Sequence, residues 1–451
     1  MATTLDLAKA GALETAKAVR SGDISALEAC DAAIARIEAL DGPINAVVVR
    51  DFDRARNAAK AVDGSRKPDD GRALLGVPMT VKESNDVAGL PSTWGFEMFK
   101  DLKAARDAAV VERLKAAGAV ILGKTNVPVA LADWQSENPV YGRTVNPFDH
   151  SRSSGGSSGG AAAALATGMV PLEIGSDIGG SIRAPSHMCG VFGHKPTYGI
   201  VPSRGHGFPG TDGVDVPLAV VGPMARNAGD LAATLDVIAG PEVAGLKLDL
   251  PAAGVKSLKG LRVRMIDRMP GVPTDADTRE VLATLSEALV KEGADVSTST
   301  EDFPPLEPMM DSYIKMLNTV ILRGSPDAQP VDAHTWMNLV DEQMRVTRDW
   351  TALFRDTDVL ISPIYSTPAP PFQTDPDWSK RTLLIDNEPY PYGGQLAWAA
   401  IATYAGLPAT AVPVGKSRDG LPIGVQIIAG PYGDRKTLAV AHLLEEAGLT
   451  L

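Results

Sequence analysis

Two short segments of this chain are dense in glycine and serine: GGSSGG at residues 155–160 and GSDIGGS at residues 175–181. Glycine lets a backbone adopt positive φ and approach a bound group closely, at a cost in chain entropy. Both segments also carry serine hydroxyls. A serine nucleophile and backbone amides that stabilise an oxyanion are the components of an acyl-transfer site. We therefore interpret residues 151–185 as the centre of such a site.

A Gly/Ser-rich run can instead be a flexible linker. Here an Ala-rich helical stretch at residues 161–167 and an apolar strand at 169–174 separate the two segments. Asp177 and Arg183 lie on either side of Ser181, where a spacer needs no charge. We therefore favour a folded site, in which Asp177 and Arg183 organise the loop by bonding its backbone and each other. Ser153 and Ser158 are expected to tie the loop together through their hydroxyls.

A serine nucleophile needs a base, which is commonly a histidine. His150, His187 and His194 surround the glycine-rich region without lying in it, and the GxSxG nucleophile elbow is absent. A Ser-His-Asp triad formed by residues that are distant in the sequence is one alternative for the base. The other candidate base is Lys82, at the end of an apolar strand expected at residues 77–81, because burial favours the neutral amine. A solvated surface lysine is the ordinary alternative.

Several stretches taken together resemble the amidase signature family. They are GVPMTVKESNDVAG (76–89), GGSSGG (155–160), GSDIGGSIRAP (175–185), GVFGHKPTYGIVPSRG (190–205), VVGPMARN (220–227), AGLPATAVPVG (405–415) and GLPIGVQIIAG (420–430). The similarity spans residues 5–446, nearly the whole chain. It implies a Ser-Ser-Lys triad, with Ser181 as nucleophile, Ser157 as bridging serine and Lys82 as base. The 24-residue separation of the two serines agrees with the family pattern, and the resemblance also implies a cis peptide bond between Gly156 and Ser157.

In the mechanism that this resemblance implies, neutral Lys82 takes a proton from Ser157, which takes one from Ser181. Ser181 attacks the substrate carbonyl, and water hydrolyses the resulting acyl-enzyme. No metal ion or organic cofactor is required. The backbone amides expected to receive the oxyanion charge are those of Ile178, Gly179, Gly180 and Ser181.

The elements that must position these residues alternate between strand and helix patterns. Residues 1–62 are expected to be helical, with Ser25 and Glu28 forming a capping box. Strands are expected at 77–81, 120–122, 169–174, 261–265, 294–296, 359–361, 409–412 and 423–428, and helices at 108–117, 161–167, 227–238, 276–292 and 434–446. This alternation predicts an α/β fold. The resemblance implies a single large mixed β-sheet covered by helices on both faces, with the N-terminal helices packed outside.

We expect residues 1–451 to form a single domain: an N-terminal helical part (1–70), a core with the catalytic motifs (71–230) and the remainder of the core (231–451). Two segments lack periodicity, 302–350 and 363–394, and are expected to be lid-like loops. Surface excursions without a role are the alternative. Candidates for lining the substrate pocket, with core packing as the alternative, are Met309, Met310, Trp336, Tyr365 and Tyr392.

Composition narrows the range of partners. A net charge of −12 argues against nucleic acids and acidic membranes as partners, because no basic field attracts phosphates. The two cysteines, Cys30 and Cys189, cannot form a disulfide framework, and with six histidines they suggest no metal-ligand cluster. No signal peptide or membrane span is evident, so a cytoplasmic protein is expected. Many members of the family are homodimers, and a homodimer stays open here.

The expected activity is hydrolysis of small-molecule amides, chiefly aryl or small apolar ones, with esters and carbamates (urethanes) within reach of the same site. The alternative is the glutamine-dependent amidotransferase of the family, which works together with partner proteins. The stretch IVPSRGHGFPGTDG at residues 200–213 resembles the stand-alone hydrolases more. A non-catalytic scaffold on this fold would be expected to lose part of the triad, whereas Lys82, Ser157 and Ser181 are all present.

Overall fold

A computed structural model describes residues 6–67, 69–211, 213, 215–243, 245–323 and 328–451. Its centre is a mixed eight-stranded sheet with the strand order β10-β9-β11-β15-β14-β7-β8-β6. Strand β9 is parallel to both neighbours, and the other pairs are antiparallel. The strands are β6 (Leu172–Asp177), β7 (Phe192–Lys195), β8 (Val220–Ala225), β9 (Arg262–Met265), β10 (Asp295–Ser297), β11 (Val359–Pro363), β14 (Ala409–Lys416) and β15 (Pro422–Ile428).

A second sheet of three strands lies beside the edge of the first. It has the order β1-β3-β2, from β1 (Val47–Arg50), β3 (Val120–Thr125) and β2 (Pro78–Lys82). Strand β2 packs alongside β6, the edge strand of the large sheet. Among the described residues, β2 and β6 are therefore neighbours that are not paired by backbone hydrogen bonds, and the two sheets remain separate.

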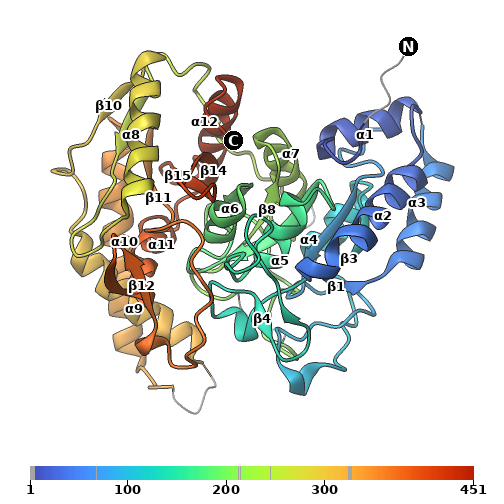
Figure 1. The fold of residues 1–451 in the computed structure, drawn as a ribbon, viewed down its shortest axis with the longest axis horizontal. Helices are drawn as coiled ribbons and strands as arrows, with labels where there is room; N and C mark the ends of the chain where they lie inside the picture. Colours follow the sequence, from blue (N-terminus) through green and yellow to red (C-terminus); the bar gives the residue numbers. More distant parts are fainter. Residues whose placement is uncertain (1–5, 68, 212, 214, 244, 324–327) are drawn as a thin grey trace.

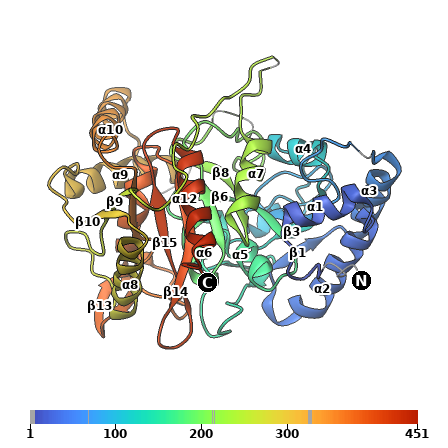
Figure 2. The same cartoon turned by 90° about the horizontal axis from the view of Figure 1, so that it is seen from above.

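Helices cover both faces of the large sheet, which confirms the predicted α/β fold class. Helices α7 and α12 pack on one face, while α5 and α6 pack on the other. Figures 1 and 2 show α1, α2 and α3 at one end of the molecule, beside the three-stranded sheet, and α8, α9 and α10 at the opposite end. The helices are α1 (Ala12–Ser21), α2 (Ala26–Ile44), α3 (Phe52–Ser65), α4 (Ala109–Ala116), α5 (Gly159–Ala166), α6 (Arg183–Cys189), α7 (Ala228–Ile238), α8 (Ala276–Lys291), α9 (Leu306–Ile321), α10 (Ala333–Leu353), α11 (Leu396–Thr403) and α12 (Asp434–Glu446).

Local capping signals explain where several helices begin. The Ser25 hydroxyl accepts a hydrogen bond from the backbone N–H of Glu28, and the Glu28 carboxylate accepts one from the Ser25 N–H, which completes the predicted capping box. Asn227 caps α7 by accepting from the backbone N–H of Asp230. Helix α12 spans the predicted residues 434–446.

The prediction of an irregular segment at 302–350 is wrong over the described residues, because α9 and α10 occupy most of it; residues 324–327 lie outside the described part. The prolines that suggested irregularity are tolerated there. Pro305 is the N-cap of α9 and Pro308 lies in its first turn, where a helix needs no backbone N–H from that residue. Buried side chains recur along α9 at helical spacing, including Met309, Tyr313 and Met316.

Three smaller differences concern strands. Residues 47–50, predicted as helix, form β1. Strand β6 begins three residues later than expected and continues through Asp177, so the first part of the second glycine-rich segment is strand. Segment 363–394 contains a hairpin of β12 (Thr382–Ile385) and β13 (Glu388–Pro391). Its turn residues Asp386 and Asn387 both have positive φ, as a type I′ turn requires.

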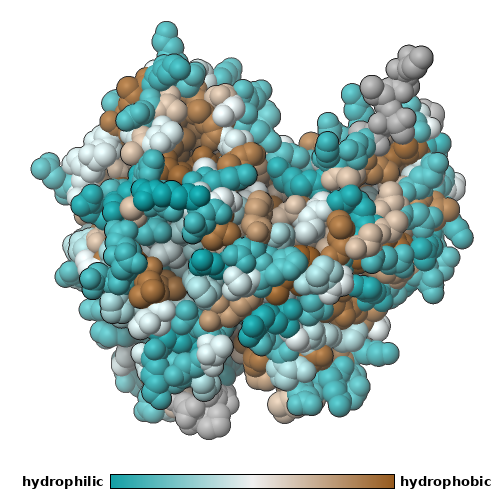
Figure 3. All heavy atoms as spheres, viewed as in Figure 1, coloured by the Kyte–Doolittle hydropathy of each residue, from teal (hydrophilic) through white to brown (hydrophobic). Residues whose placement is uncertain are grey.

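Hydrophilic residues cover most of the face in Figure 3, and the apolar residues there form separate groups. None of the helices in the described part of the chain combines the length and the apolar character that crossing a bilayer requires. The organisation of residues 1–451 as one domain stays a prediction.

Candidate active site

Lys82 lies at the end of β2 and is completely buried. Its Nζ atom lies 2.7 Å from Ser157 Oγ and 2.9 Å from Ser176 Oγ. Burial lowers the pKa of the Lys82 amine to about 7, although the carboxyl groups of Asp177 and Glu173 act in the opposite direction. A substantial share of this amine is therefore uncharged at neutral pH.

Ser157 is held by close packing of the two glycine-rich segments. The Gly156–Ser157 peptide bond is cis, as the resemblance implied. Gly155 has a φ of +83°, and a Cβ atom there would lie 2.5 Å from Pro185 Cα, so only glycine fits. Ser158 links the two segments, since its N–H donates to the Ser181 carbonyl at 3.2 Å.

Ser181 follows the turn after β6 and is 6% exposed. The carbonyl of the preceding Gly180 accepts a hydrogen bond from Ala184 N–H at 2.7 Å, which holds Ser181 directly before α6. The hydrogen bonds of the described residues connect Lys82 with Ser157 but include none between the hydroxyls of Ser157 and Ser181. Catalytic hydrogen bonds are often loose until a substrate binds.

Asp177 and Arg183 form a buried ion pair across this turn. Arg183 Nη2 lies 2.8 Å from Asp177 Oδ1, and Arg183 Nε lies 3.0 Å from Oδ2. Asp177 also accepts from the backbone N–H groups of Gly180 (2.9 Å) and Ile182 (3.1 Å). Burial alone would raise the pKa of the Asp177 carboxyl, but the positive charge and hydrogen bonds of Arg183 have the larger effect. They hold the pKa of Asp177 at about 2. These contacts are the ones expected of loop-organising residues.

The four amides expected to form an oxyanion hole are not equivalent. The Gly180 N–H already donates to Asp177, which differs from the expectation for this residue. The N–H groups of Ile178, Gly179 and Ser181 have no hydrogen-bond acceptor in the described part of the chain. These three amides remain as candidates for binding a substrate oxygen.

The histidines of the region bond elsewhere. His187 interacts with the carbonyls of Gly424 and Thr367, and His194 with Thr410 and Asp434. None of these bonds reaches either serine of the expected triad. His150 is exposed.

A third buried histidine, His206, pairs with the Ser84 hydroxyl at 3.0 Å. Burial lowers the pKa of His206 to about 3. The geometry therefore gives the histidine-base alternative no support.

Residues that the sequence interpretation missed contribute to the site. Ser176, near the end of β6, accepts a hydrogen bond from Lys82 through its hydroxyl oxygen. The feature of the sequence that could have pointed to Ser176 is its position beside Asp177 in the GSD motif. Glu173 lies on the same strand and is completely buried, which raises the pKa of its carboxyl to about 8. Two aromatic side chains, Trp134 and Tyr313, bond carbonyls of the turn before Ser181.

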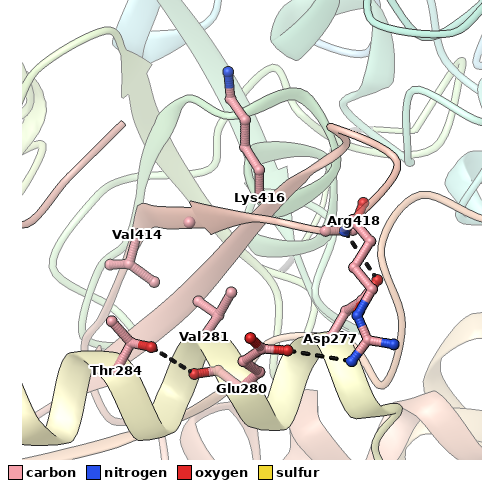
Figure 4. Close-up of a pocket in the computed structure, with 9 residues that line it drawn as sticks. Asp277, Glu280, Val281, Thr284, Val414, Lys416 and Arg418 are labelled. Carbon is pink, nitrogen blue, oxygen red and sulfur yellow. Dashed lines mark hydrogen bonds and ion pairs between the residues drawn. The ribbon is translucent and has the colours of Figure 1, made fainter.

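Two surface hollows lie outside these residues. One of about 250 Å³ opens between α8 and the end of β14, where Arg418 lies 3.2 Å from the carboxylates of both Asp277 and Glu280 (Figure 4). The other, of about 290 Å³, lies against α9 and includes Met310. No residue of the expected triad lines either hollow.

Among the other residues predicted to line a pocket, Met309, Tyr365 and Tyr392 are buried in hydrophobic clusters. Trp336 is partly buried against one of them. Met309, Tyr365 and Tyr392 therefore fit the core-packing alternative and not a pocket lining.

Comparison with known proteins identifies the family. The model of the Amidase family matches residues 28–321 and 315–438. The chain is 30% identical to human fatty-acid amide hydrolase 2, over 96% of this chain and 88% of that protein. It is 34% identical to a glutamyl-tRNA(Gln) amidotransferase subunit of Deinococcus radiodurans, over 97% of each chain. The structure of 6-aminohexanoate cyclic dimer hydrolase matches with a TM-score of 0.83 at 29% identity, covering 98% of this chain and 97% of that one.

The match to the family model extends over most of the chain and includes the glycine-rich motifs, the buried lysine and every strand of the large sheet. The chain therefore belongs to the amidase signature family and is a hydrolase that acts on the C–N bonds of amides.

Proposed function

We propose that Ser181 is the nucleophile of this amidase, with Ser157 as bridging serine and Lys82 as base. The observation that carries the proposal is the position of Lys82 Nζ, 2.7 Å from Ser157 Oγ in fully buried surroundings. Because burial lowers its pKa to about 7, the amine can accept a proton near neutral pH. Ser157, relieved of its proton, can in turn accept the proton of Ser181.

Ser181 Oγ then forms a bond to the carbonyl carbon, and negative charge develops on the carbonyl oxygen. The N–H groups of Gly179 and Ser181, with that of Ile178, are the donors available for this charge among the described residues of the turn. A preorganised donor of this kind typically contributes about 3–4 kcal/mol to transition-state stabilisation. Ser157 passes the proton that it took from Ser181 to the substrate nitrogen as the C–N bond breaks, so the leaving amine departs neutral. Lys82 then returns its proton to Ser157, which leaves the amine of Lys82 uncharged and ready for the second step.

The product of this step is an ester between the acyl group and Ser181. Water attacks the ester carbonyl after losing a proton through Ser157 to Lys82, and Ser181 regains its proton as the acid is released. Esters and carbamates offer the same carbonyl geometry to Ser181, so we include them among the candidate substrates.

The surroundings of the turn favour apolar substrates. Leu396 and the Tyr313 hydroxyl lie beside Gly179, and Ala399 and the Trp134 indole lie beside Gly180, so three of these four neighbours are aliphatic or aromatic apart from the indole N–H. Apolar and aromatic side chains complement an aryl or small apolar acyl group better than the charged α-amino and α-carboxylate groups of glutamine. We therefore propose amides with aryl or small apolar groups as the preferred class.

A glutamine-dependent amidotransferase is the second candidate, because one relative carries that name. The two candidates differ in what the purified chain does alone. A hydrolase of small amides turns over without a partner, whereas the amidotransferase uses glutamine and depends on other proteins.

The experiment is a hydrolysis panel on the purified chain: p-nitroacetanilide, an aliphatic amide, a p-nitrophenyl ester, an aryl carbamate and glutamine. A sulfonyl fluoride, followed by mass spectrometry of the peptides, locates the nucleophile. We expect turnover of the anilide and a single adduct on Ser181, which Ser181→Ala abolishes together with activity. Full activity in Ser181→Ala would overturn the nucleophile, and glutamine turnover alone would favour the amidotransferase.

A further inference from the structure

Two carbonyl groups of the turn before Ser181 are bonded by side chains from distant parts of the chain. The Tyr313 hydroxyl on α9 donates to the Ile178 carbonyl at 2.9 Å. The indole Nε1–H of Trp134 donates to the Gly179 carbonyl, also at 2.9 Å. Both side chains are buried, so neither bond competes with bulk water.

Each bond fixes the orientation of one peptide plane. In a trans peptide the N–H group points away from the carbonyl of the same plane. Trp134 therefore sets the direction of the Gly180 N–H, and this N–H does reach an acceptor, Asp177 Oδ1 at 2.9 Å. That plane is held at both ends.

The plane between Ile178 and Gly179 is held differently. Tyr313 fixes its carbonyl end, while the Gly179 N–H at the other end has no acceptor in the described part of the chain. A Cβ atom at Gly179 would lie 3.1 Å from Leu396 Cδ2, so the turn is also packed closely against α11. The Tyr313 hydroxyl is thus the polar contact that orients a free amide beside Ser181.

We propose that Tyr313 is a positioning residue, whose hydroxyl holds the Ile178 carbonyl and so aims the Gly179 N–H at the oxygen of the reacting carbonyl. Trp134 is a second positioning residue, which holds the next plane of the same turn, with its N–H on Asp177. The inference rests on the proposed function of Ser181. Tyr313 and Trp134 act through the backbone and do not touch the reacting atoms.

The two donors are themselves held firmly. The Trp134 ring packs against those of Tyr365, Trp378 and Tyr392, with centroids 5.5, 5.2 and 5.3 Å away. Tyr313 is fully buried beside Tyr404, with ring centroids 6.3 Å apart. Burial raises the pKa of the Tyr313 phenol above its usual range, so it keeps the proton it donates.

The test compares Tyr313→Phe with Tyr404→Phe. Both variants remove one hydroxyl from the same hydrophobic cluster, but the Tyr404 hydroxyl bonds no carbonyl of the turn among the described residues. The readouts are kcat and KM for the best substrate of the panel, and the inhibition constant of a trifluoromethyl ketone, which becomes an oxyanion when serine adds to it. A melting curve for each variant checks the fold.

We expect Tyr313→Phe to lower kcat about tenfold, less than the loss of a direct oxyanion donor, with KM within about twofold. The inhibition constant of the ketone should rise by the same factor as kcat falls, because both report oxyanion binding. Tyr404→Phe should match the wild type in all three. An unchanged kcat in Tyr313→Phe, or a lower kcat with unchanged ketone affinity, overturns the inference.

Trp134→Phe provides a second variant that tests the same idea if Tyr313→Phe does not fold. It removes the donor to the Gly179 carbonyl and so frees one end of the plane next to the Gly179 N–H. The ketone affinity should fall together with kcat, by a smaller factor than in Tyr313→Phe, because Asp177 still holds the other end of that plane. Ser181→Ala distinguishes a failure of the proposed function from a failure of this inference. An active Ser181→Ala overturns the proposed function and this inference with it, whereas an inactive Ser181→Ala with unaffected Tyr313→Phe and Trp134→Phe overturns the inference alone.

Discussion

The amino group of Lys82 lies 2.9 Å from the hydroxyl oxygen of Ser176, at the point where strands β2 and β6 meet. This contact is almost as short as the 2.7 Å contact between Lys82 and Ser157. The lysine is therefore held between two serines, one from each glycine-rich segment. Ser176 fixes the direction of the amine, and Ser157 is the group with which it would exchange a proton.

Replacing Ser176 by alanine should slow the enzyme without stopping it. Loss of one hydrogen bond to the amine costs about 1 kcal/mol, which corresponds to roughly a fivefold decrease in kcat/KM. Steady-state kinetics on the anilide measures it. Ser186→Ala is the matched control, because the buried Ser186 hydroxyl on α6 has no partner in the described residues. Equal rates for Ser176→Ala and the wild type would contradict the role.

The rate should rise with pH through about 7. Burial lowers the pKa of Lys82 to about 7, so the uncharged amine, the form that accepts a proton, becomes dominant above that value. A profile of kcat/KM from pH 5 to 9 should show one ascending limb and then a plateau, since kcat/KM reports the free enzyme. A rate that falls between pH 6 and pH 8 would contradict a lysine base.

The same lysine should make the fold more stable as pH rises above 7. An unfolded lysine has a pKa of about 10.4, so between pH 7 and 10 the unfolded chain binds more protons than the folded one. The contribution of Lys82 to stability therefore increases with pH across that window. Glu173, whose pKa burial raises to about 8, has the opposite effect between about pH 4 and 8, because there the folded state holds the extra proton.

Lys82→Met isolates the lysine contribution. The variant should lack hydrolytic activity yet melt at a higher temperature than the wild type at pH 7, because an apolar side chain is buried at no ionisation cost. The gap between the two melting temperatures should narrow as the pH is raised to 10. Melting curves at several pH values measure it, and a gap that widens with pH would show that Lys82 is not the source.

Motifs made of neighbouring residues could be predicted from the sequence, and contacts between distant segments could not. Helix α12 was predicted with its boundaries, because the helical periodicity of apolar residues is a local pattern. The pairing of Lys82 with Ser176 depends on strands β2 and β6 lying side by side, which no local pattern encodes. The same holds for Tyr313, whose segment was predicted to be irregular because of its prolines.

The turn before Ser181 is a second place where the sequence could not predict the structure, here the direction of single N–H groups. Four consecutive amides were expected to face the substrate, because sequence gives no orientation to a peptide plane. The structure turns the Gly180 N–H to Asp177, since the carboxylate lies beneath the turn and the left-handed φ of +91° at Gly180 allows it. Which amides stay free is therefore decided by side chains around the turn.

The buried pair of Asp177 and Arg183 should be far more costly to break than an exposed pair. Arg183→Met leaves the Asp177 carboxylate buried without its counter-charge, and the loss of one partner of such a pair costs about 3–5 kcal/mol. Arg262→Met, which breaks the partly exposed pair with Asp358, should cost less than about 1 kcal/mol. Urea unfolding of the two variants measures the difference, and similar losses in both would contradict the argument.

A double variant completes this prediction. Asp177→Asn removes the charge that Arg183→Met leaves behind, so the combination Asp177→Asn/Arg183→Met should be more stable than Arg183→Met alone. Activity should not recover, because a neutral amide holds the N–H groups of Gly180 and Ile182 less strongly than a carboxylate does. Stability that returns without activity would assign the ion pair two separable effects, one on folding and one on the shape of the turn. Full recovery of activity would show that the carboxylate is not needed to organise it.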